Sequence, residues 1–301
     1  MDSLSRRVFL GAAAALAAPA LPPEAGLRFH PAPGGGFRFD TGMLAGKAGA
    51  GGLGLTDVVH VPSGMPVSQR HGLFSFYRVF SGGTRHGRAA WEWTCEARAT
   101  AAGELELHWP ASGGRPFVLR AVYRWAAADT LDLETQVEAQ AGLPEFETFV
   151  SCYFSPLFNQ TAAYSRPPGE APRFVPAEER DGNWQWFPRD AAAAALVGRG
   201  RYKIPPNPVD WAMRPPLAAP VALRRAPEAG LAAAVMARPE ECIGLAMPYG
   251  TEAHYSIYTA LFGRTVAAGQ SARARARLKV GALTDAQVLE TFRGWLSGGA
   301  P

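Results

Sequence analysis

The chain has 301 residues, 48% of them hydrophobic and 19% charged, with a formal net charge of +4 at neutral pH. This length suits one large β domain, since sandwiches and barrels often run to roughly 200–250 residues as a single unit. The basic residues are mostly arginines scattered along the chain, and no basic stripe of the kind that neutralises phosphates is present. Nucleic acid is therefore excluded as an expected partner.

The first twenty residues have the features of a twin-arginine signal peptide. Ser5-Arg6-Arg7-Val8-Phe9-Leu10 is followed by an alanine-rich run and by the small-x-small pattern Ala18-Pro19-Ala20. As a helix, the apolar run 8–18 would span roughly 16 Å, about half of a bilayer core of ~30 Å. We therefore expect the twin-arginine machinery to export the folded protein to the periplasm or beyond, without a stable membrane anchor.

Apolar and polar residues alternate in short runs from Phe37 to Phe154, which is the period of half-buried strands. The clearest runs are 91–96, 117–125 and 131–138, and later ones are 231–236, 243–247, 254–262 and 272–280. These runs predict an all-β protein, a large antiparallel β-sandwich occupying residues 21–283. The last run places Arg273, Arg275, Arg277 and Lys279 on one face, which we interpret as a solvated strand face rather than an anion site.

Two segments break the alternation and one helix closes the chain. Residues 154–196 and the proline-rich stretch 204–220 are predicted as long loops over the sheet edges or mouth, because proline lacks the N–H that a central strand needs. In residues 284–301, Thr284 and Gln287 form a capping pattern before an apolar stripe. This predicts a C-terminal helix packed on the sandwich.

Several segments resemble a known superfamily. They are Val59-His60-Val61-Pro62-Ser63-Gly64, His71-Gly72-Leu73-Phe74-Ser75-Phe76-Tyr77-Arg78, His254-Tyr255-Ser256-Ile257-Tyr258, and the late run from Leu261 to Gln270. With the strand order, they resemble the galactose-mutarotase-like (aldose 1-epimerase-like) β-sandwich superfamily and, within it, a group of exported bacterial proteins. The similarity spans about residues 37–280.

The resemblance implies a sugar-directed activity. In the epimerases of this superfamily a histidine acts as general acid toward the ring oxygen, and a glutamate acts as general base toward the anomeric hydroxyl. His71 corresponds to the early histidine of that pattern. The segment that usually follows a second histidine is here Ser151-Cys152-Tyr153-Phe154, with no histidine, which is a departure from the pattern. Glu241 and Glu252 are both candidates for the glutamate.

Residue chemistry nominates a wider set of candidates. His60, His71 and His254 each begin or end a predicted strand, and imidazole can shuttle protons near neutral pH. Tyr255 beside His254, and Tyr77 near His71, add phenols suited to β-elimination from a uronic acid. Strand alternation turns Arg78 away from Tyr77, where its guanidinium could clamp a sugar carboxylate. The remaining candidates are loop indoles that could stack on a sugar ring: Trp184, Trp186 and Trp211.

The reaction stays open between epimerase, lyase and hydrolase, the last needing paired carboxylates. One alternative is a non-catalytic carbohydrate-binding or accessory protein, in which the tryptophans bind glycan and the histidines are structural. Another is a scaffold protein of the envelope with buried tryptophans. The histidines lack the short spacing of a metal site, no cofactor motif occurs, and Cys95, Cys152 and Cys242 are expected to be buried thiols.

Overall fold

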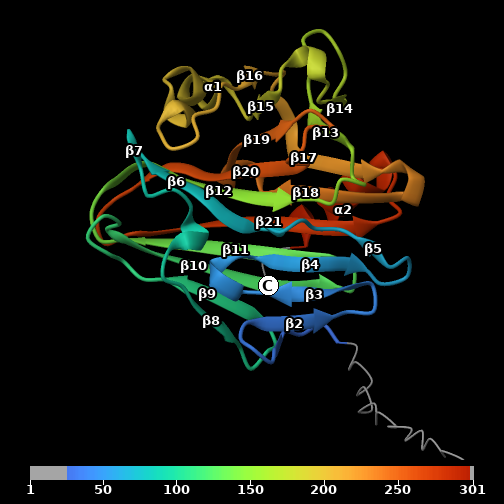
Figure 1. The fold of residues 1–301 in the computed structure, drawn as a ribbon. Helices are drawn as coiled ribbons and strands as arrows, with labels where there is room; N and C mark the ends of the chain where they lie inside the picture. Colours follow the sequence, from blue (N-terminus) through green and yellow to red (C-terminus); the bar gives the residue numbers. More distant parts are fainter. Residues whose placement is uncertain (1–25, 299–301) are drawn as a thin grey trace, which may run out of the picture.

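The protein is described from a computed structural model over residues 26–298 (Figure 1). The predicted signal peptide lies outside the described residues. Among residues 26–298, no helix is long and apolar enough to cross a membrane.

The described residues form three sheets, in which every strand pair is antiparallel except β15 with β16. The first sheet has the order β1-β2-β3-β4-β5. Its strands are β1 (His30–Pro31), β2 (Phe37–Asp40), β3 (Leu44–Ala48), β4 (Leu55–His60) and β5 (Met65–Pro66). The second sheet has the order β14-β13-β17-β18-β21-β11-β10-β9-β8. Its strands are β8 (Glu96–Ala99), β9 (Leu105–Trp109), β10 (Phe117–Ala127), β11 (Thr130–Ala139), β13 (Gln160–Ser165), β14 (Arg173–Pro176), β17 (Leu217–Ala226), β18 (Leu231–Ala237) and β21 (Ser271–Gly281).

The third sheet carries the candidate site and has the order β16-β15-β19-β20-β12-β6-β7. Its strands are β6 (Ser75–Ser81), β7 (Thr84–Arg85), β12 (Leu143–Tyr153), β15 (Trp184–Pro188), β16 (Ala212–Met213), β19 (Cys242–Pro248) and β20 (Ser256–Val266). Strands β6 and β20 both pair with β12. Segments from the first and last thirds of the chain therefore meet at the centre of this sheet.

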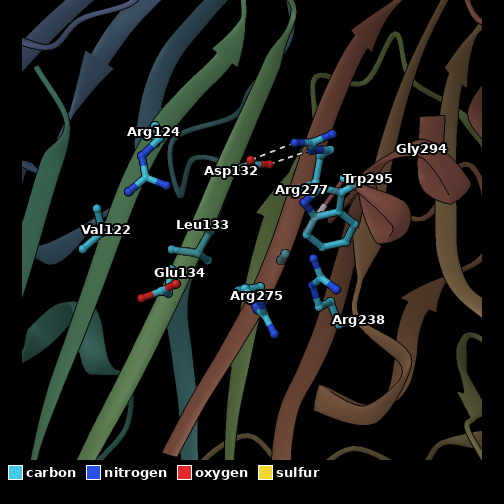
Figure 2. Close-up of a pocket in the computed structure, with 12 residues that line it drawn as sticks. Val122, Arg124, Asp132, Leu133, Glu134, Arg238, Arg275, Arg277, Gly294 and Trp295 are labelled. Atoms are coloured by element: carbon cyan, nitrogen blue, oxygen red, sulfur yellow. Dashed lines mark hydrogen bonds and ion pairs between the residues drawn. The ribbon is translucent and has the colours of Figure 1, made fainter. Parts of the chain in front are cut away.

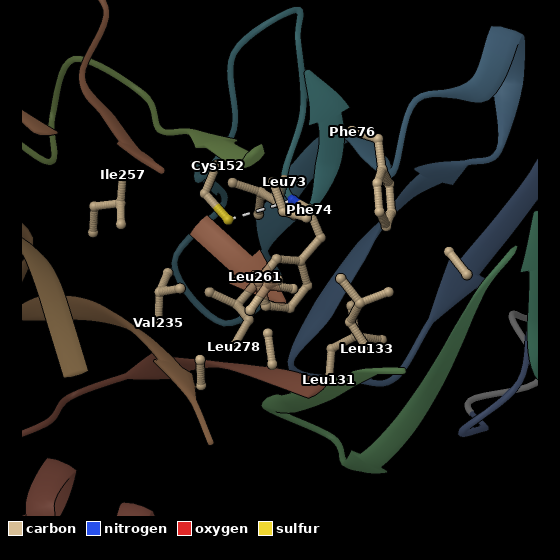
Figure 3. Packing of buried hydrophobic residues seen from close by; sticks show 14 of the residues in the cluster. Leu73, Phe74, Phe76, Leu131, Leu133, Cys152, Val235, Ile257, Leu261 and Leu278 are labelled. Atoms are coloured by element: carbon tan, nitrogen blue, oxygen red, sulfur yellow. Dashed lines mark hydrogen bonds between the residues drawn. The ribbon is translucent and has the colours of Figure 1, made fainter. Parts of the chain in front are cut away.

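The main core fills the space between the nine-stranded sheet and the other two sheets. Figure 3 shows part of it: Phe74, just before β6, and Phe76 in β6 pack with Leu131, Leu133 and residues of β18, β20 and β21. The alternating residues of β11 point into this core while their neighbours are partly exposed, as the period-two pattern requires. The antiparallel sandwich predicted from the sequence is thus confirmed.

The two α-helices cover the outer faces of the sandwich. Helix α2 (Asp285–Ser297) lies on the nine-stranded sheet, where Val288 and Phe292 are buried, and Thr284 with Gln287 forms the predicted capping box. Helix α1 (Ala191–Gly198) was not predicted, and it lies over the seven-stranded sheet, as the top of Figure 1 shows. Its alanine-rich sequence has no apolar stripe that would mark it as a helix.

Sequence predictions about strands were wrong at residues 91–95 and in both predicted loops. The segment 154–196 contains β13, β14 and β15, and the segment 204–220 contains β16 and the start of β17. Residues 91–95 form a helical turn and a coil rather than a strand, and β8 begins only at Glu96. Residues 184–188 form strand β15 rather than a loop, because their backbone pairs with β19 and their side chains are covered on both faces. A strand buried on both faces shows no alternation of apolar and polar residues, so this pattern cannot identify it.

Candidate functional site

A cleft opens on the outer face of the seven-stranded sheet. It has two adjoining lobes of about 460 Å³ and about 300 Å³. Four residues line both lobes and so mark where they meet: Tyr77, Tyr153, Asn207 and His254. His71 lines the larger lobe, so two of the three predicted histidines converge on one hollow although they lie far apart in the sequence.

His254 is held by a carboxylate from its own loop. Its Nδ1 lies 2.8 Å from an oxygen of Glu252, whose carboxylate also accepts the backbone N–H of His254 at 2.9 Å. The imidazole is about half exposed, while the Glu252 side chain is 17% exposed. In a neutral imidazole this geometry favours the proton on Nδ1, which makes Nε2 the nitrogen that could act as a base, as in a histidine oriented by an acid.

His71 occupies the opposite side of the larger lobe. Its ring stacks on Trp91 with centroids 5.3 Å apart, and Nε of Arg70 lies 3.2 Å from its Nε2. Burial, with the charges of Arg70 and His254, lowers the pKa of His71 below its usual 6.5. His71 is therefore neutral at pH 7.

Tyr153 lies between the two histidines. Its ring centroid is 5.1 Å from that of His71 and 6.3 Å from that of His254. The hydroxyl of Tyr258 donates to the hydroxyl of Tyr153 at 3.0 Å, so the Tyr153 proton is free to point elsewhere. Burial, reinforced by Tyr258, raises the pKa of Tyr153. Tyr153 is thus a protonated phenol in the middle of the cleft.

A β-bulge turns both Tyr77 and Arg78 toward the cleft. The register between β12 and β6 shifts at this point, pairing Phe149 with Arg78 and Val150 with Phe76. The prediction that Arg78 points away from Tyr77 was therefore wrong, because the extra residue breaks the alternation. Burial opposes ionisation of Tyr77, but the nearby charge of Arg78 and hydrogen bonds outweigh it, and the pKa of Tyr77 is lowered.

The guanidinium of Arg78 is hydrogen-bonded to backbone carbonyls rather than free to bind a ligand. It is 4% exposed, and its guanidinium donates to the carbonyls of Asn207 at 2.8 Å and Tyr202 at 3.5 Å. Both carbonyls belong to the segment 199–211, which covers one side of the cleft. The predicted clamp for a sugar carboxylate is thus largely occupied, although the positive charge remains beside the smaller lobe.

Indole rings form the walls of the cleft. Trp184 and Trp211 line the smaller lobe and meet edge to face, with centroids 5.6 Å apart, and the ring of Trp184 also lies 4.9 Å from that of His254. Trp91 lines the larger lobe and stacks on Tyr77. Trp186 was predicted to bind substrate, but it is fully buried behind Phe149, so it supports the floor and cannot touch a ligand.

Two further predicted residues lie elsewhere. His60 ends β4 in the five-stranded sheet, where its Nδ1 is 2.8 Å from the hydroxyl of Ser63, and it lines neither lobe. Tyr255 follows His254 but turns away from the cleft, with its ring against the buried guanidinium of Arg224. Tyr255 follows a turn and has a left-handed backbone with a φ of +45°, so the strand alternation assumed for this pair does not apply.

Four further residues line the cleft but were not predicted as site residues: Tyr153, Tyr258, Trp91 and Asn207. The available signal was the segment 151–154, which the sequence analysis singled out for its missing histidine and which contains Tyr153. Among residues 26–298, no group of three or more His, Cys, Asp or Glu is arranged to hold a metal ion.

A second cavity, of about 180 Å³, lies on the far face of the sandwich beside α2 (Figure 2). Arg277 forms a two-pronged ion pair with Asp132, and Arg275 binds Glu241. Arg277 and Arg238 both lie over the ring of Trp295. Because acids and the indole already engage these guanidinium groups, the arginine row serves to bind strands and helix together rather than to present an anion site.

Comparisons with known proteins define the fold. Neither the protein-family models nor the curated proteins give a match. Among solved structures, the Slr1438 protein from Synechocystis sp. PCC 6803 has a TM-score of 0.51 at 13% identity, over 89% of this chain and 100% of that one. A galactose mutarotase-like protein from Clostridium acetobutylicum has a TM-score of 0.48 at 9% identity, over 82% and 95% of the two chains. A galactose 1-epimerase from Lactobacillus acidophilus has a TM-score of 0.46 at 10% identity, over 82% and 94%.

At these identities the likeness to Slr1438 concerns the fold alone. The chain has the large antiparallel β-sandwich that its sequence predicted, and its structural neighbours include galactose mutarotase-like proteins.

Proposed function

We propose that this protein is a carbohydrate-active enzyme that binds an acidic saccharide in the cleft and cleaves it by proton transfer, as a β-eliminating lyase. The observation that carries the proposal is the convergence of three groups. His254 is oriented by Glu252, the neutral His71 lies opposite, and the protonated Tyr153 lies between them.

The charges around the cleft support an anionic substrate. Arg70, Arg78 and Arg88 line it, whereas Glu92 is the one carboxylate among the described lining residues and is bound to Arg88. A carboxylate on the sugar would gain from this excess of positive charge. Neutralising that carboxylate also acidifies the hydrogen on the adjacent carbon, which is the hydrogen that β-elimination removes.

The three groups then divide the proton transfers. Nε2 of His254 takes the hydrogen from the carbon next to the carboxylate, and Glu252 stabilises the imidazolium that results. The electron pair left on carbon forms a double bond and expels the glycosidic oxygen on the neighbouring carbon. Tyr153 gives its hydroxyl proton to that oxygen. The products are a shortened chain and an unsaturated acidic sugar, and the proton on His254 returns to Tyr153 through solvent.

The test is a panel of polysaccharides that contain uronic acid, each incubated with the purified protein. The proposal predicts that ultraviolet absorbance of the unsaturated product rises with at least one polymer and that its neutral counterpart gives none. If no polymer of the panel yields such a product while reducing ends or a change in optical rotation appear, the reaction is hydrolysis or epimerisation instead.

The lowered pKa of His71 predicts how activity depends on pH. A histidine whose pKa is depressed stays neutral at pH 7 and gains its proton only below its ordinary pKa of about 6.5. If the neutral ring contacts substrate, kcat/KM falls on acidification below that value. Comparing pH profiles of the wild type and His71→Gln checks this, because the acid limb should change in the variant. An unchanged limb contradicts a role for His71.

A non-catalytic carbohydrate-binding protein is the second candidate, favoured by the indole walls of the smaller lobe. Both readings predict that Trp184→Ala or Trp211→Ala weakens binding of an oligoglucuronate about tenfold, the effect of losing roughly 1.4 kcal/mol of contact. Trp295→Ala, on the far face, is the matched control and should leave affinity unchanged. Calorimetric titration gives the comparison, and equal affinities for all variants would remove the cleft from consideration.

The proposal includes export by the twin-arginine pathway, on the evidence of residues 1–20 alone. Replacing Arg6 and Arg7 by lysine should retain the protein in the cytoplasm of its bacterial host. Cell fractionation measures this, and periplasmic accumulation of the variant would count against this route.

A further inference from the structure

Arg224 is a fully buried arginine that forms no ion pair with any acid among residues 26–298. It lies in β17 on the face that carries Ala222 and Ala226 into the core. A buried charge is costly unless it is well bonded, so a cation at this position needs a reason. Its neighbour Arg225 points to the opposite face, where it pairs with Asp285.

The guanidinium of Arg224 forms hydrogen bonds with both ends of the loop that carries His254. Nη1 donates to the carbonyl of Gly250 at 2.9 Å, and Nε lies 3.4 Å from the carbonyl of Ser256. A second bond from Nη1 reaches the carbonyl of Phe158 at 2.9 Å. One rigid planar group therefore fixes the span between residues 250 and 256 and ties it to a third segment of the chain.

The loop between these anchors is tight and strained. Tyr255 has a φ of +45°, in the left-handed region, and its ring lies 5.7 Å from the guanidinium carbon. A Cβ on Gly250 would meet the carbonyl of Asn159 at 2.3 Å, so the backbone there packs without room for a side chain. Strained conformations persist only where the surroundings over-determine them, and Arg224 supplies much of that surrounding.

The charge of Arg224 also acts on Glu252. Burial lowers the pKa of Arg224 to about 9, and the carboxylate of Glu252 opposes that shift, so Arg224 stays protonated at neutral pH. Its Nη2 has no hydrogen-bond partner among the described residues. A buried cation without an ion pair attracts nearby negative charge, so the charges of Arg224 and Glu252 attract each other within this loop.

We infer that Arg224 is the positioning residue of the Glu252–His254 pair. It fixes both ends of the loop and so holds the Glu252 carboxylate where it accepts from Nδ1 of His254, without itself touching substrate. This inference rests on the proposed function only in taking His254 as the working base.

The test reads the tautomer of His254 directly, by nitrogen-15 NMR of the imidazole in the mature protein without ligand, with His254→Gln assigning the signal. The wild type should show the Nδ1–H tautomer as its dominant neutral form. In Arg224→Met and in Glu252→Gln that form should become the minor one, whereas the matched control Arg225→Met should keep it dominant. A folded Arg224→Met protein that keeps the Nδ1–H tautomer overturns the inference.

Arg224→Lys covers the case in which Arg224→Met does not fold. Lysine keeps the charge but cannot bridge Gly250 and Ser256 as a planar fork does, so the His254 signal should split or broaden between tautomers. A single Nδ1–H signal identical to that of the wild type would overturn the positioning role. Because the measurement needs no substrate, failure of every polysaccharide assay would refute the proposed function and leave the tautomer result standing.

Discussion

Replacing His254 by alanine is expected to abolish turnover while leaving the substrate bound. Losing a positioned general base costs roughly 10²–10⁴-fold in rate, and the imidazole of His254 is the one that Glu252 prepares for that role. Binding should change little, because the arginines and the indoles of the cleft walls remain in place. Steady-state kinetics on the polymer identified in the panel, with calorimetry for affinity, separates the two effects.

The matched control is His108→Ala, which removes a partly exposed histidine of β9 on the nine-stranded sheet. It should retain full turnover. If His254→Ala and His108→Ala are equally active, the catalytic interpretation fails and the cleft is at most a binding site.

Replacing Arg201 by methionine is expected to destabilise the fold by roughly 3–5 kcal/mol, the usual cost of leaving one member of a buried ion pair alone. Its guanidinium is 2.9 Å from a carboxylate oxygen of Glu147, and both side chains are almost wholly buried. Tyr202 also donates to Glu147. These bonds tie the segment 199–211, which carries Asn207 and Trp211 to the cleft, onto β12. Chemical denaturation at pH 7 measures the loss.

The same variant should lose less stability in acid. Burial raises the pKa of Glu147 even against the opposing charge of Arg201. Below this raised pKa the buried carboxyl is neutral and loses little when Arg201 is removed. The stability loss of the variant therefore grows as pH rises through the raised pKa and Glu147 becomes charged. Lys203→Met is the control, since Lys203 and Asp210 form an exposed pair worth less than about 1 kcal/mol. An equal loss in both variants would show that the buried pair does not anchor the segment.

The sequence predicted long strands that have one face in solvent. The runs 117–125 and 131–138 correspond to β10 and β11, in which buried and exposed residues alternate. The pattern failed for β15, whose Trp186 packs against the segment 199–211 on one face while Phe187 packs into the main core on the other. Apolar and polar residues alternate only where one face of a strand is exposed to solvent. A strand that is buried on both faces therefore lacks the alternation by which a strand is recognised.

The site was predictable in its residue types but not in its assembly. His71 and His254 meet because β6 and β20 both pair with β12, a topology that no local pattern encodes. The bulge that turns Arg78 inward is a one-residue register shift, visible only against its partner strand. His60 sits at a comparable strand end, yet its strand belongs to another sheet.

The most direct test of the central claim follows the histidine side chains by NMR while an oligoglucuronate is added, with a neutral glucose oligosaccharide of equal length as the comparison. The cleft predicts that the signals of His71 and His254 shift with the acidic sugar, that they shift far less with the neutral one, and that the signal of His60 stays in place. If His60 responds while His71 and His254 do not, or if both sugars act alike, the cleft is not a site for acidic saccharides.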